Sequence, residues 1–371
     1  MPLADTRNEA RRVMEVCNAC RYCEGYCAVF PAMELRRAFS DGDLDYLANL
    51  CHGCRGCYYA CPYSPPHEFA INVPRAFTAL RADTYEAYAW PGPLAWLFRR
   101  NGLAVAGITA LGLALVLFLT IVLRDRVVLF GVHRDPGAFY KLIPFEWMAG
   151  LAGLTFGFAI VAMGMGVLRF WRETGAGTPA DGSAWSRALS DVLTLRYLGG
   201  GGHGCNDLDE TFSRLRRGMH HALFYGFGLC FASTSVAAFY EHGLGRLAPY
   251  PLLSPPVLLG TAGGVGMLIG ASGLLWLKAK GDPGPSQPRM AGADVALLLL
   301  LWMTAGTGLL LLLLRESAAM GSLLAVHLGF VLALFVAMPY SKFMHGFYRA
   351  AALLRYAKEQ RAGLARDAGT A

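Results

Sequence analysis

The first quarter of the chain is polar, and long apolar runs dominate the rest. Residues 1 to about 98 mix charged and apolar positions, whereas polar residues become sparse after that point. A helix needs about 20 apolar residues to cross a bilayer. Soluble core helices would show a polar stripe at 3.6-residue spacing, which these runs mostly lack. The pattern therefore predicts six membrane-spanning helices, at about residues 103–123, 148–170, 219–240, 256–277, 293–314 and 319–340.

The segments that connect these runs differ in charge, and the difference predicts an orientation. Lys and Arg are concentrated before the first run, in the long loop 172–218, after the fourth run and in the tail 346–371. Cytoplasmic loops carry such an excess of positive charge. We therefore expect a multi-pass protein of the bacterial cytoplasmic (inner) membrane, with both termini and the N-terminal domain in the cytoplasm.

The composition favours a membrane protein over a soluble enzyme or a nucleic-acid binder. Hydrophobic residues make up 55% of the chain, charged residues only 16%, and the mean hydropathy is +0.38, which is too apolar for an ordinary soluble enzyme. The net charge of +7 could indicate nucleic acid, but the basic residues flank the apolar runs. We therefore expect membrane lipid and no nucleic acid as a partner. The first sixteen residues lack the apolar core of a signal peptide, so we expect no cleaved leader.

Eight of the ten cysteines form two runs with identical spacing in the N-terminal quarter. The spacing is Cys-x2-Cys-x2-Cys-x3-Cys, which is typical of bacterial ferredoxins, where the fourth cysteine of each run ligates the other cluster. We therefore predict two [4Fe–4S] clusters. The ligands of one would be Cys17, Cys20, Cys23 and Cys61, and those of the other Cys51, Cys54, Cys57 and Cys27.

Other uses of these cysteines fit the spacing less well. Zinc also binds Cys-x2-Cys pairs, but it usually draws two ligands from each of two such pairs. Disulfides are excluded by the reducing cytoplasm that the orientation predicts. Pro62 follows the second run as the ferredoxin motif expects, whereas Ala28 follows the first. The segment 28–50 has a helical pattern, so we expect a helical ferredoxin-type domain.

Four histidines at or within the apolar runs are candidate haem ligands. His327 and His345 are eighteen residues apart at the sixth run, so one continuous helix would place them on the same face, about 27 Å apart. His220 and His221 begin the third run, on the same side of the membrane as His345. Imidazoles from two facing helices hold a b-type haem within a bundle. We therefore predict one haem b between His345 and one member of the adjacent pair.

Of the adjacent pair we favour His221, because it shares a helical seam with Gly218 and Gly228, which leave room for a flat macrocycle. His220 lines up with phenylalanines instead. In the alternative interpretation, both are interfacial histidines that bind nothing. A second haem at His327 would need a partner on the third run, which offers only a cysteine or a distant histidine at the plausible depth.

Two glycine-rich segments lack the context of nucleotide-binding motifs. Gly199 to Cys205, within the long loop, has no preceding strand and no following Gly-Lys-Ser/Thr, so we expect a docking or cofactor-facing loop. The glycines of residues 260–270 lie inside an apolar run, where small residues let helices approach closely. We identify no catalytic triad, paired-carboxylate site or flavin-binding unit in the sequence. The chain is therefore expected to carry electrons and not to transform a substrate.

Several separated motifs together resemble one protein family. The two cysteine runs, the six apolar runs and the segments YLGGGGHGCND, RRGMHHALFYGF and MPYSKFMHGFYR are similar to the tricarballylate (or citrate) utilisation B family, from about Cys17 to Arg355. The membrane half also resembles, more remotely, the cytochrome b subunit of respiratory nitrate reductase. That family likewise carries two histidines eighteen apart on its last helix, and Pro339 to His345 matches the context of the second. Its second histidine on an early helix has no counterpart here, which argues against an outer haem.

The resemblance implies a partner protein. That partner is an FAD-dependent tricarballylate dehydrogenase, which oxidises tricarballylate to cis-aconitate. The present chain would reoxidise its flavin and pass electrons through two [4Fe–4S] clusters and haem b to quinone. One alternative is an electron-transfer subunit of a heterodisulfide or sulfur-compound reductase. Another is a tricarboxylate transporter with a redox-sensing head, although the spans hold little Lys or Arg at mid-membrane and show no inverted repeat.

The sequence thus predicts an all-α protein in three parts. A helical ferredoxin-type 2[4Fe–4S] domain occupies residues 1–98. A six-helix transmembrane bundle with the haem site and the loop 172–218 occupies residues 99–345. A cytoplasmic tail follows over residues 346–371.

Overall fold

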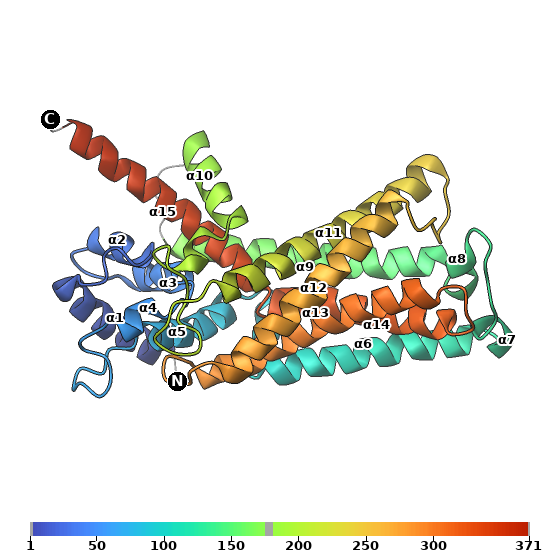
Figure 1. Ribbon diagram of the computed structural model, residues 1–371, viewed down its shortest axis with the longest axis horizontal. Coiled ribbons are helices and arrows are strands. Elements are labelled where there is room, and N and C mark those ends of the chain that lie inside the picture. The colour runs from blue at the N-terminus through green and yellow to red at the C-terminus, as the bar shows by residue number, and fades with distance from the viewer. Residues whose placement is uncertain (1–2, 175–180, 370–371) are drawn as a thin grey trace.

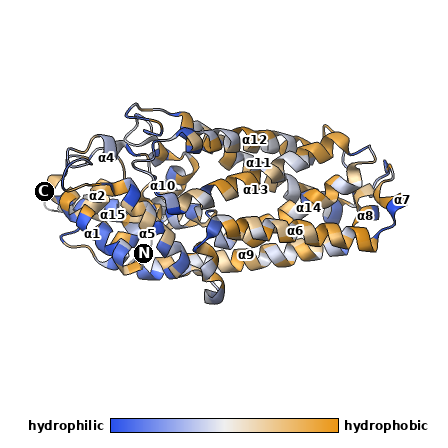
Figure 2. Ribbon diagram, turned by 90° about the horizontal axis from the view of Figure 1, so that it is seen from below, coloured by the Kyte–Doolittle hydropathy of each residue, from blue (hydrophilic) through white to orange (hydrophobic). Residues whose placement is uncertain are grey.

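The computed structural model describes residues 3–174 and 181–369, and its cysteine-bearing helices lie at one end of a bundle of long helices (Figure 1). The long helices are largely hydrophobic, and hydrophilic residues gather at the end that holds α1 and α5 (Figure 2). Within the described ranges the chain forms helices, turns and one isolated bridge between Cys205 and Ser213, with no strand. The prediction of an all-α protein with a membrane bundle is confirmed.

Five short helices build the N-terminal domain. They are α1 (Leu3–Cys20), α2 (Val29–Glu34), α3 (Asp41–Leu50), α4 (Gly56–Tyr59) and α5 (Val73–Tyr88). The first cysteine run begins in the last turn of α1, and the second follows the end of α3. A capping box starts α3, because the Ser40 hydroxyl accepts a hydrogen bond from the Asp43 amide while the Asp43 carboxylate accepts one from the Ser40 amide. The helical pattern predicted for residues 28–50 therefore forms α2 and α3.

A buried carboxylate ties three of these helices together. Asp45 on α3 is fully buried and accepts hydrogen bonds from Arg7 on α1 at 2.6 Å and from the Tyr88 hydroxyl on α5 at 2.6 Å. A buried charge is tolerated only when it is paired and hydrogen-bonded in this way. The contact holds α1, α3 and α5 in the arrangement that presents the cysteine runs.

Six long helices follow, and each is long and apolar enough to cross a membrane. They are α6 (Asn101–Leu123), α9 (Phe145–Glu173), α11 (Leu215–Leu244), α12 (Pro255–Lys280), α13 (Pro288–Leu314) and α14 (Met320–Ala337), the last extended by η3 (Met338–Tyr340). Shorter helices connect or flank them: η1 (Gly92–Phe98), α7 (Arg126–Leu129), α8 (Ala138–Leu142), α10 (Gly182–Leu193) and η2 (Arg196–Gly199). The six predicted runs are all present, which is consistent with a multi-pass membrane protein.

Glycines let α11 and α12 pack in direct backbone contact. A Cβ added at Gly270 would lie 2.5 Å from the Leu223 nitrogen, and one added at Gly263 would lie 2.7 Å from the Cys230 nitrogen. Such spacing leaves no room for a side chain, and small residues are the usual means of close helix approach within a membrane. The expectation for residues 260–270 is therefore confirmed.

The last apolar run does not continue as one helix to His345. α14 ends at Ala337, η3 follows, Ser341 is extended, and a new helix, α15 (Met344–Gly369), begins after it. Pro339 lacks the N–H that an uninterrupted helix needs at its position. The prediction that His327 and His345 share one continuous helix is therefore wrong.

Helix α15 leaves the bundle and packs against the N-terminal domain and α10 (Figure 1). Arg355 pairs with Asp43 on α3 at 2.8 Å, and Glu359 pairs with Arg36 at 2.5 Å. The guanidinium of Arg355 also lies over the Tyr46 ring, 4.2 Å from its centre. The C-terminal segment thus clamps the cysteine-bearing domain against the end of the bundle.

Candidate iron–sulfur and haem sites

The two cysteine runs share an unusual backbone conformation. Arg21 and Arg55 occupy the same position in the two runs, directly after the second cysteine, and their φ angles are 55° and 67°. A non-glycine residue in this left-handed region costs about 1–2 kcal/mol. Its recurrence at matching positions means that both runs form the same kind of loop.

Four cysteines from both runs meet at a site that we call the outer site: Cys17, Cys20, Cys23 and Cys61. Burial, together with the neighbouring thiolates of Cys23 and Cys61, raises the pKa of Cys17 to about 12. Burial also raises the pKa of Cys23 to about 12, with Cys61 and Cys20 as the charged neighbours. These thiols therefore share one electrostatic environment, in which a cation would be needed to stabilise the thiolate forms.

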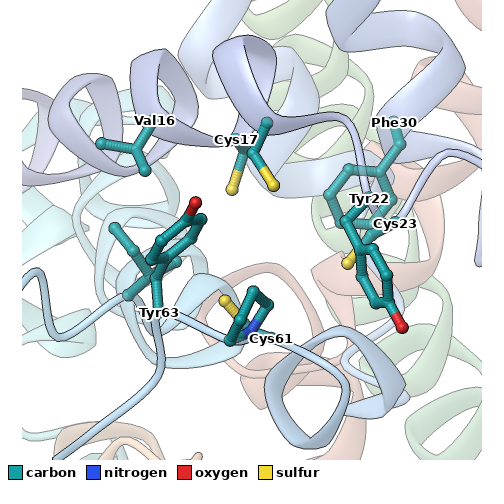
Figure 3. Close-up of a pocket in the computed structure, with 10 residues that line it drawn as sticks. Val16, Cys17, Tyr22, Cys23, Phe30, Cys61 and Tyr63 are labelled. Carbon is teal, nitrogen blue, oxygen red and sulfur yellow. The ribbon is translucent and has the colours of Figure 1, made fainter. Parts of the chain in front are cut away.

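The outer site surrounds about 300 Å³ of space between atoms, part of which is open to solvent. Figure 3 shows Cys17, Cys23 and Cys61 approaching this space from different sides, with Tyr63 beside it. Apolar groups such as Val16 and Phe30 complete the walls. Converging thiols in an apolar cavity fit an iron–sulfur cluster, whose potential depends on burial and on hydrogen bonds to sulfur.

The other four cysteines form a second group that we call the inner site: Cys27, Cys51, Cys54 and Cys57. Burial raises the pKa of Cys27 well above its usual range, and Cys54 and Cys51 are its strongest charged neighbours. Burial does the same for the pKa of Cys57, followed by Cys54 and Cys27. The outer and inner sites are the two groups of four that the crosswise ferredoxin pattern predicts.

Backbone amides point at the sulfurs of both sites. The Gly53 amide donates to Cys51 Sγ at 3.4 Å, two residues along the chain. Amides at the same offset donate to three further cysteines and counteract the rise in their pKa: Val29 to Cys27, Gly56 to Cys54 and Tyr63 to Cys61. Hydrogen bonds of this kind stabilise thiolates and tune the potential of a cluster.

Three arginines hold the loop of the inner site from different helices. Arg81 on α5 and Arg349 on α15 both donate to the Cys51 carbonyl, at 2.5 and 2.8 Å. Arg216 on α11 donates to the Gly53 carbonyl at 2.6 Å. The inner site therefore lies where the N-terminal domain meets α11 and α15.

The segment 199–206, which we call the glycine loop, covers the inner site. Its Gly200 comes so close that an added Cβ would lie 3.7 Å from Cys54 Sγ, and the Asn206 amide donates to the Cys54 carbonyl at 2.9 Å. Gly201 lies against the backbone of Gly25. This placement agrees with the expectation of a cofactor-facing loop.

Two histidines lie close together on the helices whose arginines contact the loop of the inner site. The rings of His220 on α11 and His345 on α15 have their centres 6.1 Å apart and are inclined at 67°. Ring centres about 6 Å apart would leave room for one metal ion between the two imidazoles, so His220 and His345 would be the residues that hold a haem iron. The Nδ1 atom of His345 lies 2.5 Å from the Lys342 carbonyl, an arrangement that leaves Nε2 for a metal. The pair therefore has the spacing that a bis-histidine haem requires, and the Lys342 carbonyl orients one of its two rings, that of His345.

The other two candidate histidines lie elsewhere. His221, which we favoured over His220, turns away from His345, and its Nε2 lies 3.1 Å from the Thr194 carbonyl. His327 contacts the Thr307 hydroxyl at 3.2 Å, deep in the bundle. The two candidate partners for His327 contact other residues: the Cys230 thiol lies against the Gly260 carbonyl, and the His242 ring packs on Phe145. The geometry thus joins His345 to His220, and it leaves a second, outer haem at His327 without a second ligand.

Sequence reasoning missed the role of Arg216 and Arg349. Arg216 lies four residues before His220, and Arg349 lies four residues after His345. Residues four apart share a helix face, so each helix presents one histidine and one arginine together. An arginine four residues from each of the two histidines was a signal that the sequence already contained.

Within the described part of the chain, no group of three or more His, Cys, Asp or Glu side chains lies close enough to hold a single metal ion. A cluster spreads its thiolates over four irons, so they stand farther apart than the ligands of one ion. Cys205 is fully buried beside the inner site, and its thiol donates to the Leu198 carbonyl at 2.7 Å.

Comparison with known proteins places the whole chain in one family. The family model described as "Citrate utilization protein B" matches residues 97–366, and "Citrate utilization protein B Fer4-like domain" matches residues 10–87. A curated protein named "Citrate utilization protein B", from Escherichia coli, is 48% identical over 371 residues, which is 100% of this chain and 96% of that protein. No solved structure matches the chain. This protein therefore belongs to the citrate utilization protein B family, with a Fer4-like domain preceding its membrane bundle.

Proposed function

We propose that this protein is a membrane-anchored electron carrier that reoxidises the reduced FAD of a partner dehydrogenase and delivers the electrons to the quinone pool. The path would run through two [4Fe–4S] clusters, held by the outer and inner sites, and one haem b, held by His220 and His345. When bound, these groups supply one-electron chemistry that amino-acid side chains cannot. The observation that carries the proposal is the succession of the outer site, the inner site and the histidine pair from the free end of the domain into the bundle.

The exposure of the two cysteine sites supports a direction for this path. Cys20 of the outer site is exposed, and Tyr22 beside it is 66% exposed. In the inner site Cys51 and Cys54 are buried under the glycine loop. A protein partner can therefore approach the outer site closely, while the inner site faces the membrane helices. We assign the outer site to the entry of electrons and the inner site to their transfer inward.

The arginine contacts support a short step from the inner site to the histidine pair. Arg216 and Arg349 reach the inner loop, and His220 and His345 lie one turn away on the same two helices. One turn of α-helix spans about 5.4 Å along its axis. The same two helices thus hold the inner loop and the proposed haem ligands in a fixed relation.

The partner is proposed from the family. The Escherichia coli relative is named for citrate utilization, and the sequence motifs resemble a family that serves an FAD-dependent tricarballylate dehydrogenase. We infer that the present chain belongs to a citrate or tricarballylate utilisation system. Oxidation of the tricarboxylate would occur on the flavoprotein, and this chain would receive only electrons.

We also propose that both cysteine sites lie on the cytoplasmic side of the inner membrane. Helices α1 to α5, α10 and α15 occupy one end of the bundle (Figure 1), and the Lys and Arg residues concentrate in the segments at that end. The positive-inside rule assigns such an end to the cytoplasm. Residues 1–98, 99–345 and 346–371 then correspond to the iron–sulfur domain, the membrane domain and the tail.

Anaerobic purification of the full chain in detergent provides the test. We expect non-haem iron and acid-labile sulfide in equal amounts, an EPR signal after reduction with dithionite, and a b-type haem band in the reduced-minus-oxidised spectrum. Mixing with a substrate-reduced FAD-dependent tricarballylate dehydrogenase should bleach the cluster absorbance. Protein that contains zinc without labile sulfide would overturn the proposal.

A further inference from the structure

Helix α10 is amphipathic, and the rest of the protein covers only part of its apolar face. Its small residues Ala184 and Ala188 are buried against Leu354 and Ala357 of α15. Its three largest apolar side chains are exposed instead: Trp185 by 59%, Leu189 by 58% and Leu193 by 40%. They recur every four residues and therefore form one exposed stripe along the helix, which we call the α10 stripe.

The position of α10 places this stripe at the edge of the membrane. The spanning helices run along the long axis of the molecule, whereas α10 runs steeply across that axis at the end of the bundle (Figure 1). A helix that crosses the bundle axis in this way lies nearer to the plane of the membrane than to its normal. Amphipathic helices that bind membranes lie in that plane, with their apolar face toward the acyl chains.

The C-terminal end of α10 is hydrogen-bonded to α11. The Tyr225 hydroxyl donates to the Leu193 carbonyl at 2.7 Å, and the Arg217 guanidinium donates to the Thr194 carbonyl at 2.7 Å. Of the six spanning helices, α11 is the least buried within the bundle, and its Tyr225 is 48% exposed. The α10 stripe is therefore continuous with a surface of the bundle that faces lipid.

The length of α11 locates this junction relative to the bilayer. α11 has 30 residues, which span about 45 Å, whereas the hydrocarbon layer is about 30 Å thick. Its ends therefore extend beyond the hydrocarbon, and the first turns, which carry Arg216 and Arg217, form one such end. Tyr225 follows these turns, and tyrosines concentrate at the boundary between hydrocarbon and head groups. The α10 stripe therefore meets α11 at this boundary.

Basic residues flank the α10 stripe on the polar side of the helix. Arg187 lies on that side together with three serines. Arg196 follows the end of α10, and its side chain is 60% exposed and lies 3.6 Å from Asp191. Guanidinium groups beside an inserted apolar face attract the phosphates of anionic lipids.

We propose that α10 is an interfacial helix that binds phospholipid. The α10 stripe inserts among the head groups and upper acyl chains of the leaflet at this end of the bundle, and Arg187 and Arg196 contact anionic phosphates. Because α10 packs on α15, the lipid contact also holds the helix that carries His345 and clamps the N-terminal domain. The lipid contact requires no cofactor at the cysteine sites or at the histidine pair.

Site-specific crosslinking of the full chain tests this contact. The protein is reconstituted into nanodiscs of phosphatidylglycerol and phosphatidylcholine, and the photoreactive residue p-benzoylphenylalanine replaces one position at a time. We expect lipid adducts, detected by mass spectrometry, at Trp185 and Leu189. The adducts should be lost at Ser183 and Ser190, which lie on the polar side of the same helix. Leu154 on α9 serves as the positive control, because it is 76% exposed within a spanning helix.

The control separates a wrong proposal from a protein that has failed to insert. If Leu154 forms lipid adducts while Trp185 and Leu189 form none, the stripe faces water or a protein and the proposal is overturned. Crosslinks from Trp185 and Leu189 to a second copy of the chain in place of lipid would overturn it as well. Equal lipid yields on the apolar and polar sides of α10 would also contradict it, because an interfacial helix immerses one side only.

The lipid composition of the adducts tests the role of the arginines. The share of phosphatidylglycerol among the adducts should be higher at Trp185 than at Leu154. Arg187→Gln should reduce this excess by up to about fivefold, the effect of one basic residue near a membrane surface. Equal shares at the two positions in the wild-type background would overturn the assignment of anionic phosphates to Arg187 and Arg196.

Discussion

Gly201 lies where the glycine loop crosses the first cysteine run, and a side chain has no room there. A Cβ added to it would lie 2.8 Å from the Gly25 carbonyl oxygen and 3.1 Å from the Tyr26 carbonyl oxygen. Both are backbone atoms, which cannot rotate away as a flexible side chain could. Gly201→Ala must therefore move the loop or the run. Overpacking of this kind costs about 1–3 kcal/mol, which would raise the population of a displaced loop about 5- to 150-fold.

Gly199→Ala provides a matched control in the same loop. An added Cβ at Gly199 would meet only the Arg217 side chain, at 3.5 and 3.8 Å, which is ordinary contact. Neither Gly199 nor Gly201 has the positive φ that would strain alanine. Both variants add one methyl group, but only in Gly201→Ala does this group collide with backbone atoms.

The assay is the loss of visible absorbance when anaerobically purified protein is exposed to air. The glycine loop covers Cys54, so a displaced loop should admit oxygen and accelerate bleaching of the inner cluster. We expect Gly201→Ala to bleach faster than wild type, by up to the 5- to 150-fold set by the overpacking cost, and Gly199→Ala to match wild type. Equal rates for the two variants would refute the assignment of the loop as a cover.

Three further predictions follow from the same sites. Cys61→Ser should remove the EPR signal of the cluster that the first run holds, and Cys27→Ser that of the other, whereas a run-by-run arrangement would give the reverse. His220→Leu should abolish the haem band in the reduced-minus-oxidised spectrum and His221→Leu should keep it; loss of haem in only the second variant would restore our earlier preference. Arg355→Met should lower the free energy of unfolding by roughly 2 kcal/mol, because it removes charged hydrogen bonds to the N-terminal domain. Denaturant titration would measure this change, and an unchanged midpoint would contradict a stabilising role for α15.

The helices of this protein were predictable because their signals are local. Six apolar runs of membrane length became six long helices, and the spacing of the cysteines anticipated two groups of four. Periodicity, run length and ligand spacing each act over a few tens of residues. These three signals can therefore be read from the sequence even when the contacts between helices are unknown.

The choice between His220 and His221 depended on contacts that no local pattern contains. We reasoned from small residues on one seam of α11, but the rotation of α11 is set by its glycine contacts with α12 and by Arg216 at the inner loop. That rotation turns His220 toward His345 and His221 toward Thr194. The break in the helix near Pro339 was not predicted either, and it sets the position of His345 because it redirects α15.

The buried arginines give an argument for an anionic cofactor that does not depend on cysteine spacing. Arg81 is 6% exposed and donates to the carbonyls of Ala48 and Cys51 and to a threonine hydroxyl; Arg349 donates to Cys51 as well. Within the described residues, these hydrogen bonds all go to neutral oxygens. Two guanidinium groups brought together without a carboxylate are costly unless another negative charge is near. Four thiolates around a cluster at the inner site would supply that negative charge. The positive arginines would in turn stabilise the thiolates.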